Sequence, residues 1–441
     1  MNRRNMFLIV GLCFLAVVLP LKAQRDTYLS VDDALLLAVQ NNKNIRMAEL
    51  EHRMANADFH QTDALFLPQL STGYQAVVTN NPLNAFGFLL QQERVTAQDF
   101  DPAKLNHPGI TRNYGVSVDV QMPLFNPDMI YARQGAKIQK YVYKHKSQYT
   151  VDYIKFEVQK AYTRLQFAYQ ARAVLRATLS DVEQILRSVQ NFYEQGLVQK
   201  SDVLNAQVQV NTIESALTKA ESSISNASDG LKLLLGMEQV EGGNVFLTDS
   251  LVLKEETGIA ASFSPMRSDV LAMQRAVDAS NAMVKSSVMK FLPKINAFGS
   301  YQFNDTKFFG FDNNSYLAGV SLTWTIFSGN RNASKLRSDI LRRDKLKLDL
   351  EEYKDKSRME VNKTARDLQD LKQEIRKHQA SVEQADEALR IMNNRYKEGL
   401  ASTTDLLASQ AQFSQQKLSL AQAVMSYNVT YYYQELLTSV K

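Results

Sequence analysis

One stretch of this sequence occurs twice, and the two copies lie 203 residues apart. The first copy covers residues 191–207 and the second covers residues 394–410, with Asn, Tyr, Gly, Leu, Asp, Leu and Gln at matching places. Solenoid repeats are about 20 to 50 residues long, so this period is too long for a solenoid unit. The repeat predicts that a whole structural half was duplicated, and that each half carries a helix–glycine–helix tip.

The N-terminus predicts a cleaved secretory signal peptide over residues 1–23. Two arginines precede an apolar run from Met6 to Leu19, and Ala23 suits the residue before the cleavage site. An uncleaved anchor helix is the alternative, but about 15 apolar residues is short of the roughly 20 that a bilayer span needs. Since the single cysteine, Cys13, lies in this segment, we expect no disulfide, thiol chemistry or lipid anchor in the mature chain.

Proline placement predicts very long helices. Residues 128–264 and 294–441 contain no proline, although the chain has nine. Within them, residues 128–195 and 330–398 correspond to about 100 Å of helix each. Their apolar residues recur alternately every three and four positions, which is typical of a coiled-coil seam. In the first long helix we assign Val158, Leu165, Val182, Val189 and Tyr193 to this seam.

The seams predict two antiparallel helical hairpins, over residues 127–236 and 329–441. Gly196 and Gly399 suit the left-handed turn that ends the outgoing helices. Ser201 and Thr404 are candidates to cap the returning helices.

Four segments alternate apolar and polar residues, as half-buried β-strands do. They are residues 69–79, 113–123, 294–304 and 316–327. Each pair follows a predicted helix that ends at Leu-Pro, because proline disfavours helix in the residue before it. The loop within the first pair is about 21 residues longer than the loop within the second.

The sequence therefore divides into a signal peptide and two similar halves. The first repeat covers residues 24–236, an irregular link covers residues 237–264, and the second repeat covers residues 265–441. Each repeat consists of a helix, two strands and a long helical hairpin. The fold class is mostly α with a transmembrane β part.

The strands have the length and pattern of membrane-barrel strands. Aromatic residues such as Tyr74, Tyr316 and Trp324 suit the interfacial girdles of such barrels. A soluble four-stranded sheet packed on helices is the alternative, but the polar second face, with Asp119 in mid-strand, favours the barrel. Four strands cannot close a barrel and a membrane does not tolerate an open edge, so closure requires several chains, and three would supply twelve strands.

The doubled strand–strand–helix plan, the Leu-Pro helix ends and the repeated Tyr-x-x-Gly-Leu tip resemble TolC-like outer membrane efflux proteins over essentially the whole mature chain. The resemblance implies a homotrimer with one 12-stranded β-barrel in outer-membrane lipid, an α-helical tunnel in the periplasm and the link as an equatorial belt. It implies a passive exit duct of a tripartite efflux or type I secretion system, which docks on a periplasmic adaptor (membrane fusion protein) and an inner-membrane pump.

The same resemblance assigns roles to residues of the tips. Asp202 would bond Tyr396 in a closed periplasmic gate, and Asp405 would project into the tunnel as part of an acidic ring. The sequence departs from the family pattern at Ala401, where the family prototype has a gate arginine, and at Ala408, where it has a second acid. The residues expected to contact the adaptor are Gly196, Leu197, Gly399 and Leu400.

Simpler interpretations stand beside these. Asp202 and Asp405 are also the acids that favour the positive start of a helix. Tyr193 is better explained as the end of the seam than as part of a gate.

No catalytic residues, cofactor or metal site are expected. A Ser-His-Asp set, a phosphate loop and a catalytic carboxylate pair are lacking in any convincing setting, and the five histidines show no tight metal spacing. Without the three positive residues of the signal peptide the net charge falls from +5 to +2, so nucleic acid is not an expected partner. An alternative of another class is a periplasmic coiled-coil adaptor or scaffold without a membrane barrel. The transported substrate is not encoded.

Overall fold

The computed structural model describes residues 27–238, 245–255 and 262–439. The predicted signal peptide lies outside these residues. The chain forms two compact units, each assembled from three separate segments. The first unit contains Met1–Asn42, Lys155–Glu255 and Leu368–Tyr432, and the second contains Lys43–Ile154, Glu256–Asp367 and Tyr433–Lys441.

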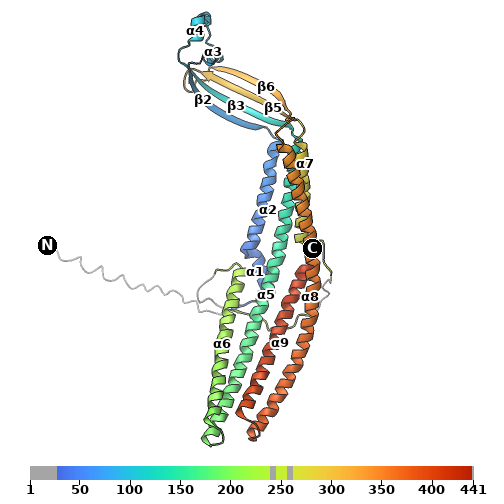
Figure 1. Cartoon of the computed structure of the whole chain (residues 1–441). Helices are drawn as coiled ribbons and strands as arrows, with labels where there is room; N and C mark the ends of the chain where they lie inside the picture. The colour runs from blue at the N-terminus through green and yellow to red at the C-terminus, as the bar shows by residue number, and fades with distance from the viewer. Residues whose placement is uncertain (1–26, 239–244, 256–261, 440–441) are drawn as a thin grey trace, which may run out of the picture. The chain divides into compact units, whose positions relative to one another are not determined.

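The second unit contains one antiparallel sheet of four strands in the order β2-β3-β5-β6 (Figure 1). Gln69 pairs with Gln121, Met122 with Ala297, and Lys294 with Thr323. The two edge strands, β2 and β6, each have one neighbour, so the sheet is open within the chain. The strands are β2 (Gln69–Thr79), β3 (Thr111–Phe125), β5 (Lys294–Asp305) and β6 (Asn313–Thr323).

Two strands differ from their predicted bounds. Strand β3 is longer at both ends than residues 113–123. Strand β6 begins earlier than residues 316–327, because Asn313 pairs with Asn304. It ends at Thr323 because the neighbouring strand begins at Lys294, directly after Pro293, which has no N–H to donate to a ladder.

The longer loop of the first strand pair carries short helices, which the sequence did not reveal. They are α3 (Pro82–Gln91), the 3-10 turn η2 (Ala97–Phe100) and α4 (Pro102–Asn106). Asn81 and Asp101 cap the two α-helices, and a proline follows each cap at the first helical position.

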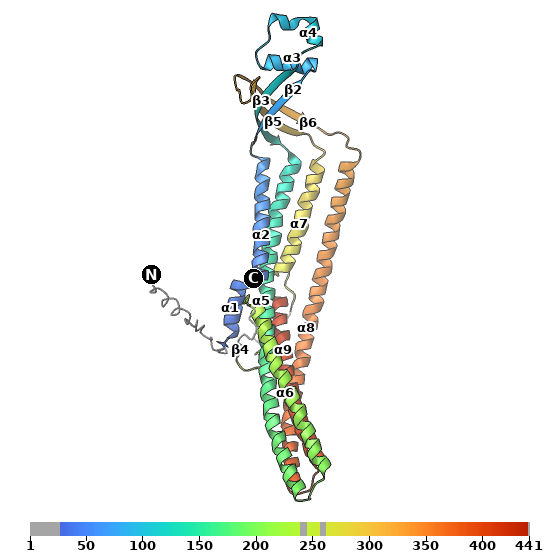
Figure 2. The ribbon, with the colours of Figure 1, turned by 90° about the vertical axis from the view of Figure 1, so that its left-hand side faces the viewer.

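Four helical segments complete the second unit and lie side by side (Figure 2). The Ser286 hydroxyl of α7 donates to the Asp128 carbonyl of α5 at 2.7 Å, and the Ser287 hydroxyl donates to Asp339 of α8 at 2.6 Å. Gly135 of α5 lets Met283 approach closely, since a Cβ there would lie 3.2 Å from the Met283 sulfur. The segments come from α2 (Lys43–Gln61), α5 (Pro127–Glu194), α7 (Ser268–Met289) and α8 (Arg331–Lys397).

The first unit contains the tip-side parts of the predicted hairpins. Helix α5 is followed by α6 (Lys200–Leu234), and α8 by α9 (Thr403–Thr438). The seam residues Val158, Leu165, Val182 and Val189 are fully buried, as the periodicity predicts. Tyr193 is a correction, because it is 44% exposed and does not finish the seam.

The first helix is interrupted, which the sequence did not reveal. Helix α1 (Val31–Asn41) ends at Asn42, whose backbone is extended. The buried Asn42 amide donates to the Leu234 carbonyl at the end of α6 at 2.7 Å. Gly236, with φ of +69°, packs against the Asn41 carbonyl, where a Cβ would lie at 2.3 Å. The chain after the break continues as α2 and the 3-10 turn η1 (Thr62–Leu65).

The described part of the link in the first unit, residues 245–255, is held by strand pairing and by side-chain hydrogen bonds. Its strand β4 (Phe246–Leu247) pairs in parallel with β1 (Thr27–Tyr28). Tyr169 of α5 donates to the Phe246 carbonyl at 2.7 Å, and Asn428 of α9 donates to the Val252 carbonyl at 2.8 Å. The described helices include none that is both long and apolar enough to cross a membrane.

Candidate functional site

The first tip joins α5 to α6 and ends α5 in a Schellman motif. The Gly196 N–H donates to the Tyr193 carbonyl at 2.9 Å, and the Leu197 N–H donates to the Phe192 carbonyl at 2.8 Å. Gly196 has φ of +75°, a conformation that strains residues with a side chain. The turn leaves Leu197 67% exposed.

The second tip joins α8 to α9 with the same geometry. The Gly399 N–H donates to the Tyr396 carbonyl at 3.0 Å, and the Leu400 N–H donates to the Arg395 carbonyl at 2.8 Å. Gly399 has φ of +71°, and Leu400 is also 67% exposed. The two tips therefore present one apolar side chain each on equivalent turns.

Both returning helices begin with a capping box that contains the candidate gate acid. The Asp202 carboxylate accepts from the Gln199 N–H at 3.0 Å. The Asp405 carboxylate accepts from the Ser402 N–H at 3.2 Å and from the Ser402 hydroxyl at 2.7 Å. Gln199 and Ser402 are therefore the caps, rather than the predicted Ser201 and Thr404. The Ser402 hydroxyl and N–H lower the pKa of Asp405 below its usual value.

Tyr396 is the most enclosed of the candidate residues. It is 5% exposed, and its hydroxyl lies 3.4 Å from that of Thr403. Burial raises the pKa of Tyr396, the Thr403 bond opposes this, and the nearby charge of Asp202 raises it further. Among the described residues, Tyr396 and Asp202 thus have these partners in place of the expected bond with each other.

Phe192 is a residue of this site that the sequence analysis missed. Its ring centroid lies 5.7 Å from that of Tyr396, whereas the adjacent Tyr193, which was predicted to finish the seam, is 44% exposed. Val189 and Leu406 complete the buried cluster at the tips. The apolar side chain at position 192 is a sequence signal for this contact, but the tyrosine beside it is the residue that both copies of the repeat share.

A cavity of about 390 Å³ lies between α5, α8 and α9 next to this cluster. Phe192, Tyr396 and Leu406 form its apolar wall. Its polar wall includes Asp181, whose carboxylate accepts from the buried amide of Gln410 at 3.0 Å. Tyr396 therefore stands between the packed tip and a partly polar space among the helices.

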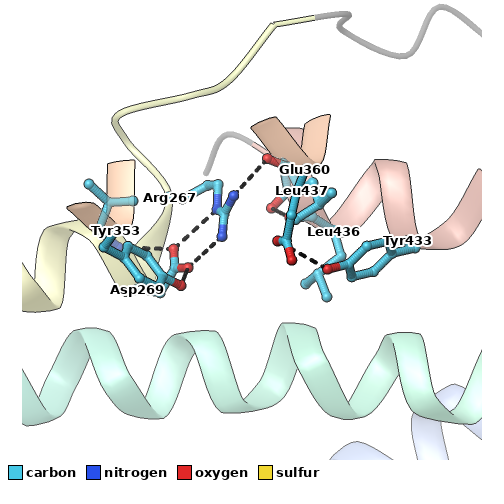
Figure 3. A network of polar contacts seen from close by, with 9 residues as sticks. Arg267, Asp269, Tyr353, Glu360, Tyr433, Leu436 and Leu437 are labelled. Carbon is cyan, nitrogen blue, oxygen red and sulfur yellow. Dashed lines mark hydrogen bonds and ion pairs between the residues drawn. The ribbon is translucent and has the colours of Figure 1, made fainter. Parts of the chain in front are cut away.

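The second unit contains a buried polar clamp that joins three helices (Figure 3). Arg267, directly before α7, donates to Asp269 through Nε at 3.2 Å and Nη2 at 2.5 Å, and through Nη1 to the Leu437 carbonyl at 3.2 Å. The Tyr353 hydroxyl of α8 donates to the same carboxylate. Arg267 and Asp269 are only 4% and 8% exposed. A cation thus satisfies a free carbonyl at the end of α9, where a helix has no internal donor.

Burial governs the titration of the groups around this clamp. It raises the pKa of the Tyr353 and Tyr149 phenols, and the negative charge of Asp269 adds to the effect. Burial and the nearby carboxylate of Glu360, which accepts from the Tyr433 hydroxyl at 3.2 Å, raise the pKa of Tyr433 to about 12. These phenols therefore remain neutral donors at physiological pH.

The described part of the chain contains no group of three or more His, Cys, Asp or Glu side chains that could hold a metal ion. The chemistry of the tips is that of packing, helix capping and charge.

Solved structures of channel proteins share this fold. A crystal structure of CusC superposes with a TM-score of 0.80 at 17% identity, over 95% of this chain and 94% of the other. The Campylobacter jejuni CmeC outer membrane channel also superposes with a TM-score of 0.80, at 14% identity, over 92% and 85%. The chain thus has the fold of these channel structures.

The sequence model described as "Outer membrane efflux protein" matches residues 34–237 and 266–431. The chain belongs to the outer membrane efflux protein family, and the resemblance stated from the sequence is confirmed. A relative is the probable outer membrane lipoprotein SilC of Salmonella typhimurium, 21% identical over 87% of this chain and 80% of that protein. The family is one of efflux channels.

Proposed function

We propose that this protein is the outer-membrane exit duct of a tripartite efflux or type I secretion system. Three chains would join their sheets into one 12-stranded barrel, and their helices would continue it as a periplasmic tunnel. The duct would conduct passively, receiving its substrate from a periplasmic adaptor and an inner-membrane pump. The pump would supply the energy and select the cargo.

The observation that carries the proposal is the exposed apolar face of an open sheet. Leu70, Tyr316, Val320 and Leu322 are between 64% and 82% exposed, which is costly in water and favourable in lipid. Edge strands β2 and β6 have unpaired backbone groups on one side, which a membrane does not tolerate. Insertion into lipid removes the first cost, and strand pairing between copies of the chain removes the second.

The tips support a gate at the periplasmic end. Threefold symmetry would bring three Asp405 carboxylates to one constriction, where an acidic ring attracts cations. Tyr396 would hold the constricted ends through the buried cluster that it forms with Val189 and Leu406, and a bond from Asp202 to Tyr396 would close them. The capping role of the two acids and a pore role are compatible, because a cap uses only part of each carboxylate.

Outer membrane fractionation and planar-bilayer conductance test the duct. We expect heat-modifiable trimers in the outer membrane that open ion channels in bilayers. Divalent cations should block them, and Asp405→Asn should weaken the block while it retains an acceptor for the Ser402 N–H. Asp278→Asn, an exposed change on α7, is the control. A soluble periplasmic monomer would instead support the adaptor or scaffold alternative.

The exposed leucines would form the contact with the adaptor. We expect Leu197→Asp together with Leu400→Asp to abolish site-specific crosslinking to the adaptor, while trimers persist. Leu204→Asp changes a side chain of similar exposure on α6 and should leave crosslinking intact. Unchanged crosslinking in the double variant would remove these leucines from the interface.

A further inference from the structure

All four connections between strands and long helical segments lie at the same end of the strands. We call this end the helical edge of the sheet, to distinguish it from the edge strands β2 and β6. The strands are antiparallel neighbours, so the start of β2, the end of β3, the start of β5 and the end of β6 meet there. Each connection carries two adjacent large apolar side chains with exposed fractions between 42% and 82%. The pairs are Phe66–Leu67, Leu124–Phe125, Phe291–Leu292 and Ile326–Phe327.

The one tryptophan of the chain belongs to this edge. Trp324 is 58% exposed, and its indole Nε1–H donates to the Phe291 carbonyl at 3.0 Å. It therefore joins the residue that follows β6 to the connection between α7 and β5 while its ring stays accessible. An indole with an apolar body and a satisfied polar atom suits a membrane–water interface.

Cations lie on three of the four helical segments directly beyond the apolar pairs, those of α5, α7 and α8. We define the basic band as residues 58–68, 127–137, 285–294 and 331–339, all within about three turns of a connection. It contains eight Lys and Arg residues but four acids, a net charge of +4. The whole mature chain carries only +2, so the excess is local.

Most acids of the band are already neutralised by a cation within it. Arg133 bonds Asp63, Lys294 contacts Asp128 at 2.8 Å, and Lys335 contacts Asp339 at 2.5 Å. Only Asp58 remains without such a cation among the described ion pairs. The band cations left without an acidic partner in the described residues are Lys137, Lys285, Lys290, Arg331 and Arg337.

The opposite edge of the sheet lacks this excess. Residues 80–112 and 305–313, which connect the strands there, contain four Lys and Arg residues and five acids. The charge is therefore asymmetric between the two edges. From sheet to helix, the order is exposed apolar strand, exposed aromatic and leucine pairs, then unpaired cations. This order matches the hydrocarbon, interface and headgroup depths of one bilayer leaflet.

We propose that the basic band is a binding surface for anionic phospholipid headgroups of the periplasmic leaflet. The proposal rests on the proposed function, because the strands must sit in the outer membrane. The exposed, unpaired cations contact headgroup phosphates, and their aliphatic stems lie along the apolar pairs. Each Lys or Arg near an anionic surface strengthens attachment by roughly fivefold, and salt weakens it.

Trp324 provides a reporter without any label. The full-length protein is reconstituted in phosphatidylcholine vesicles that contain brominated phosphatidylglycerol or brominated phosphatidylcholine, with the bromines near the headgroup end of the chains. Bromine quenches indole fluorescence on contact, so the ratio of quenching reports lipid preference at this edge. We expect phosphatidylglycerol to be preferred by roughly fivefold at low salt, and the preference to shrink in high salt.

Matched variants locate the effect. Lys137→Gln, Lys285→Gln and Arg331→Gln together remove one exposed cation from each of α5, α7 and α8, and should bring the ratio near one. Lys354→Gln, Lys356→Gln and Lys363→Gln together remove the same charge lower on α8 and should leave it unchanged. If the first combination fails to assemble, Arg331→Gln alone should lower the ratio.

The outcomes separate this proposal from the proposed function. Strong quenching by both lipids with a ratio of one overturns the basic band and leaves the membrane sheet intact. An equal drop in both triple variants also overturns it, because net charge rather than position would be responsible. Absence of quenching by either lipid places Trp324 outside the bilayer and refutes the proposed membrane sheet itself.

Discussion

Replacing Arg267 with methionine should open the end of α9 locally. The change removes three hydrogen bonds, two to Asp269 and one to the Leu437 carbonyl, at a site only 4% exposed. Breaking a buried ion pair by removing one partner costs roughly 3 to 5 kcal/mol, because the other charge stays buried. Tyr353 still donates to that carboxylate, so we take about 3 kcal/mol, the lower end of the range.

Hydrogen exchange measured by mass spectrometry reports the loss of local stability at the end of α9 and the start of α7. Local opening sets the exchange rate, so about 3 kcal/mol corresponds to a loss of protection of roughly a hundredfold. The peptides to compare cover residues 433–439 at the end of α9 and residues 267–275 at the start of α7. Peptides at the tips of the first unit should not change.

Two further variants make the measurement decisive. Arg275→Met breaks a pair with Asp278 in which both side chains are about half exposed, so protection should change by less than about threefold. Arg267→Met combined with Asp269→Leu removes both charges and should recover most of the protection. If Arg267→Met changes exchange no more than Arg275→Met does, the clamp is not a stabilising element and the reasoning fails.

Two other predictions concern the tips. Gly399→Ala should destabilise the second tip by about 1 kcal/mol, since φ of +71° strains a side chain although no atom lies within 4 Å. Gly230→Ala, a control inside α6 near its C-terminal end, should stabilise its helix. Thermal unfolding followed by circular dichroism would contradict this if both variants shifted in one direction. Asp405 should titrate below 3.8, so its capping contribution is fully present above that pH and is lost as the pH falls through the lower folded value. Carboxyl chemical shifts measure this midpoint, and Ser402→Ala should return it toward 3.8; an unmoved midpoint in that variant would contradict the assigned cause.

The repeated tip shows how far local sequence reaches. The left-handed conformation expected at Gly196 and Gly399 is found at both, because glycine adopts it without strain. The helices on either side are predicted by the spacing of their apolar residues. The seams of α5 and α6 follow for the same reason. Alternation likewise indicated strands, since its period of two differs from that of a helix.

Other features depend on contacts between residues that are distant in the sequence, and the spacing of apolar residues does not predict these contacts. The break at Asn42 exists because its amide reaches Leu234, 192 residues away. Phe192, not Tyr193, contacts Tyr396 because the relative rotation of two helices decides which neighbour faces inward. The caps fell on Gln199 and Ser402, two residues before those expected, because the Schellman turns fix where each returning helix starts.

The sequence by itself determined the duplication, the helical and strand periods and the glycine turns, because each is a property of neighbouring residues. It also carried the apolar pairs and the cations, but not their meeting at one edge of the sheet. Tertiary structure alone decided that edge, the clamp of Arg267, Asp269 and Tyr353, and the enclosure of Tyr396. The physical reason is that burial and ion pairing arise from side chains brought together by folding, whose separation along the chain carries no local signal.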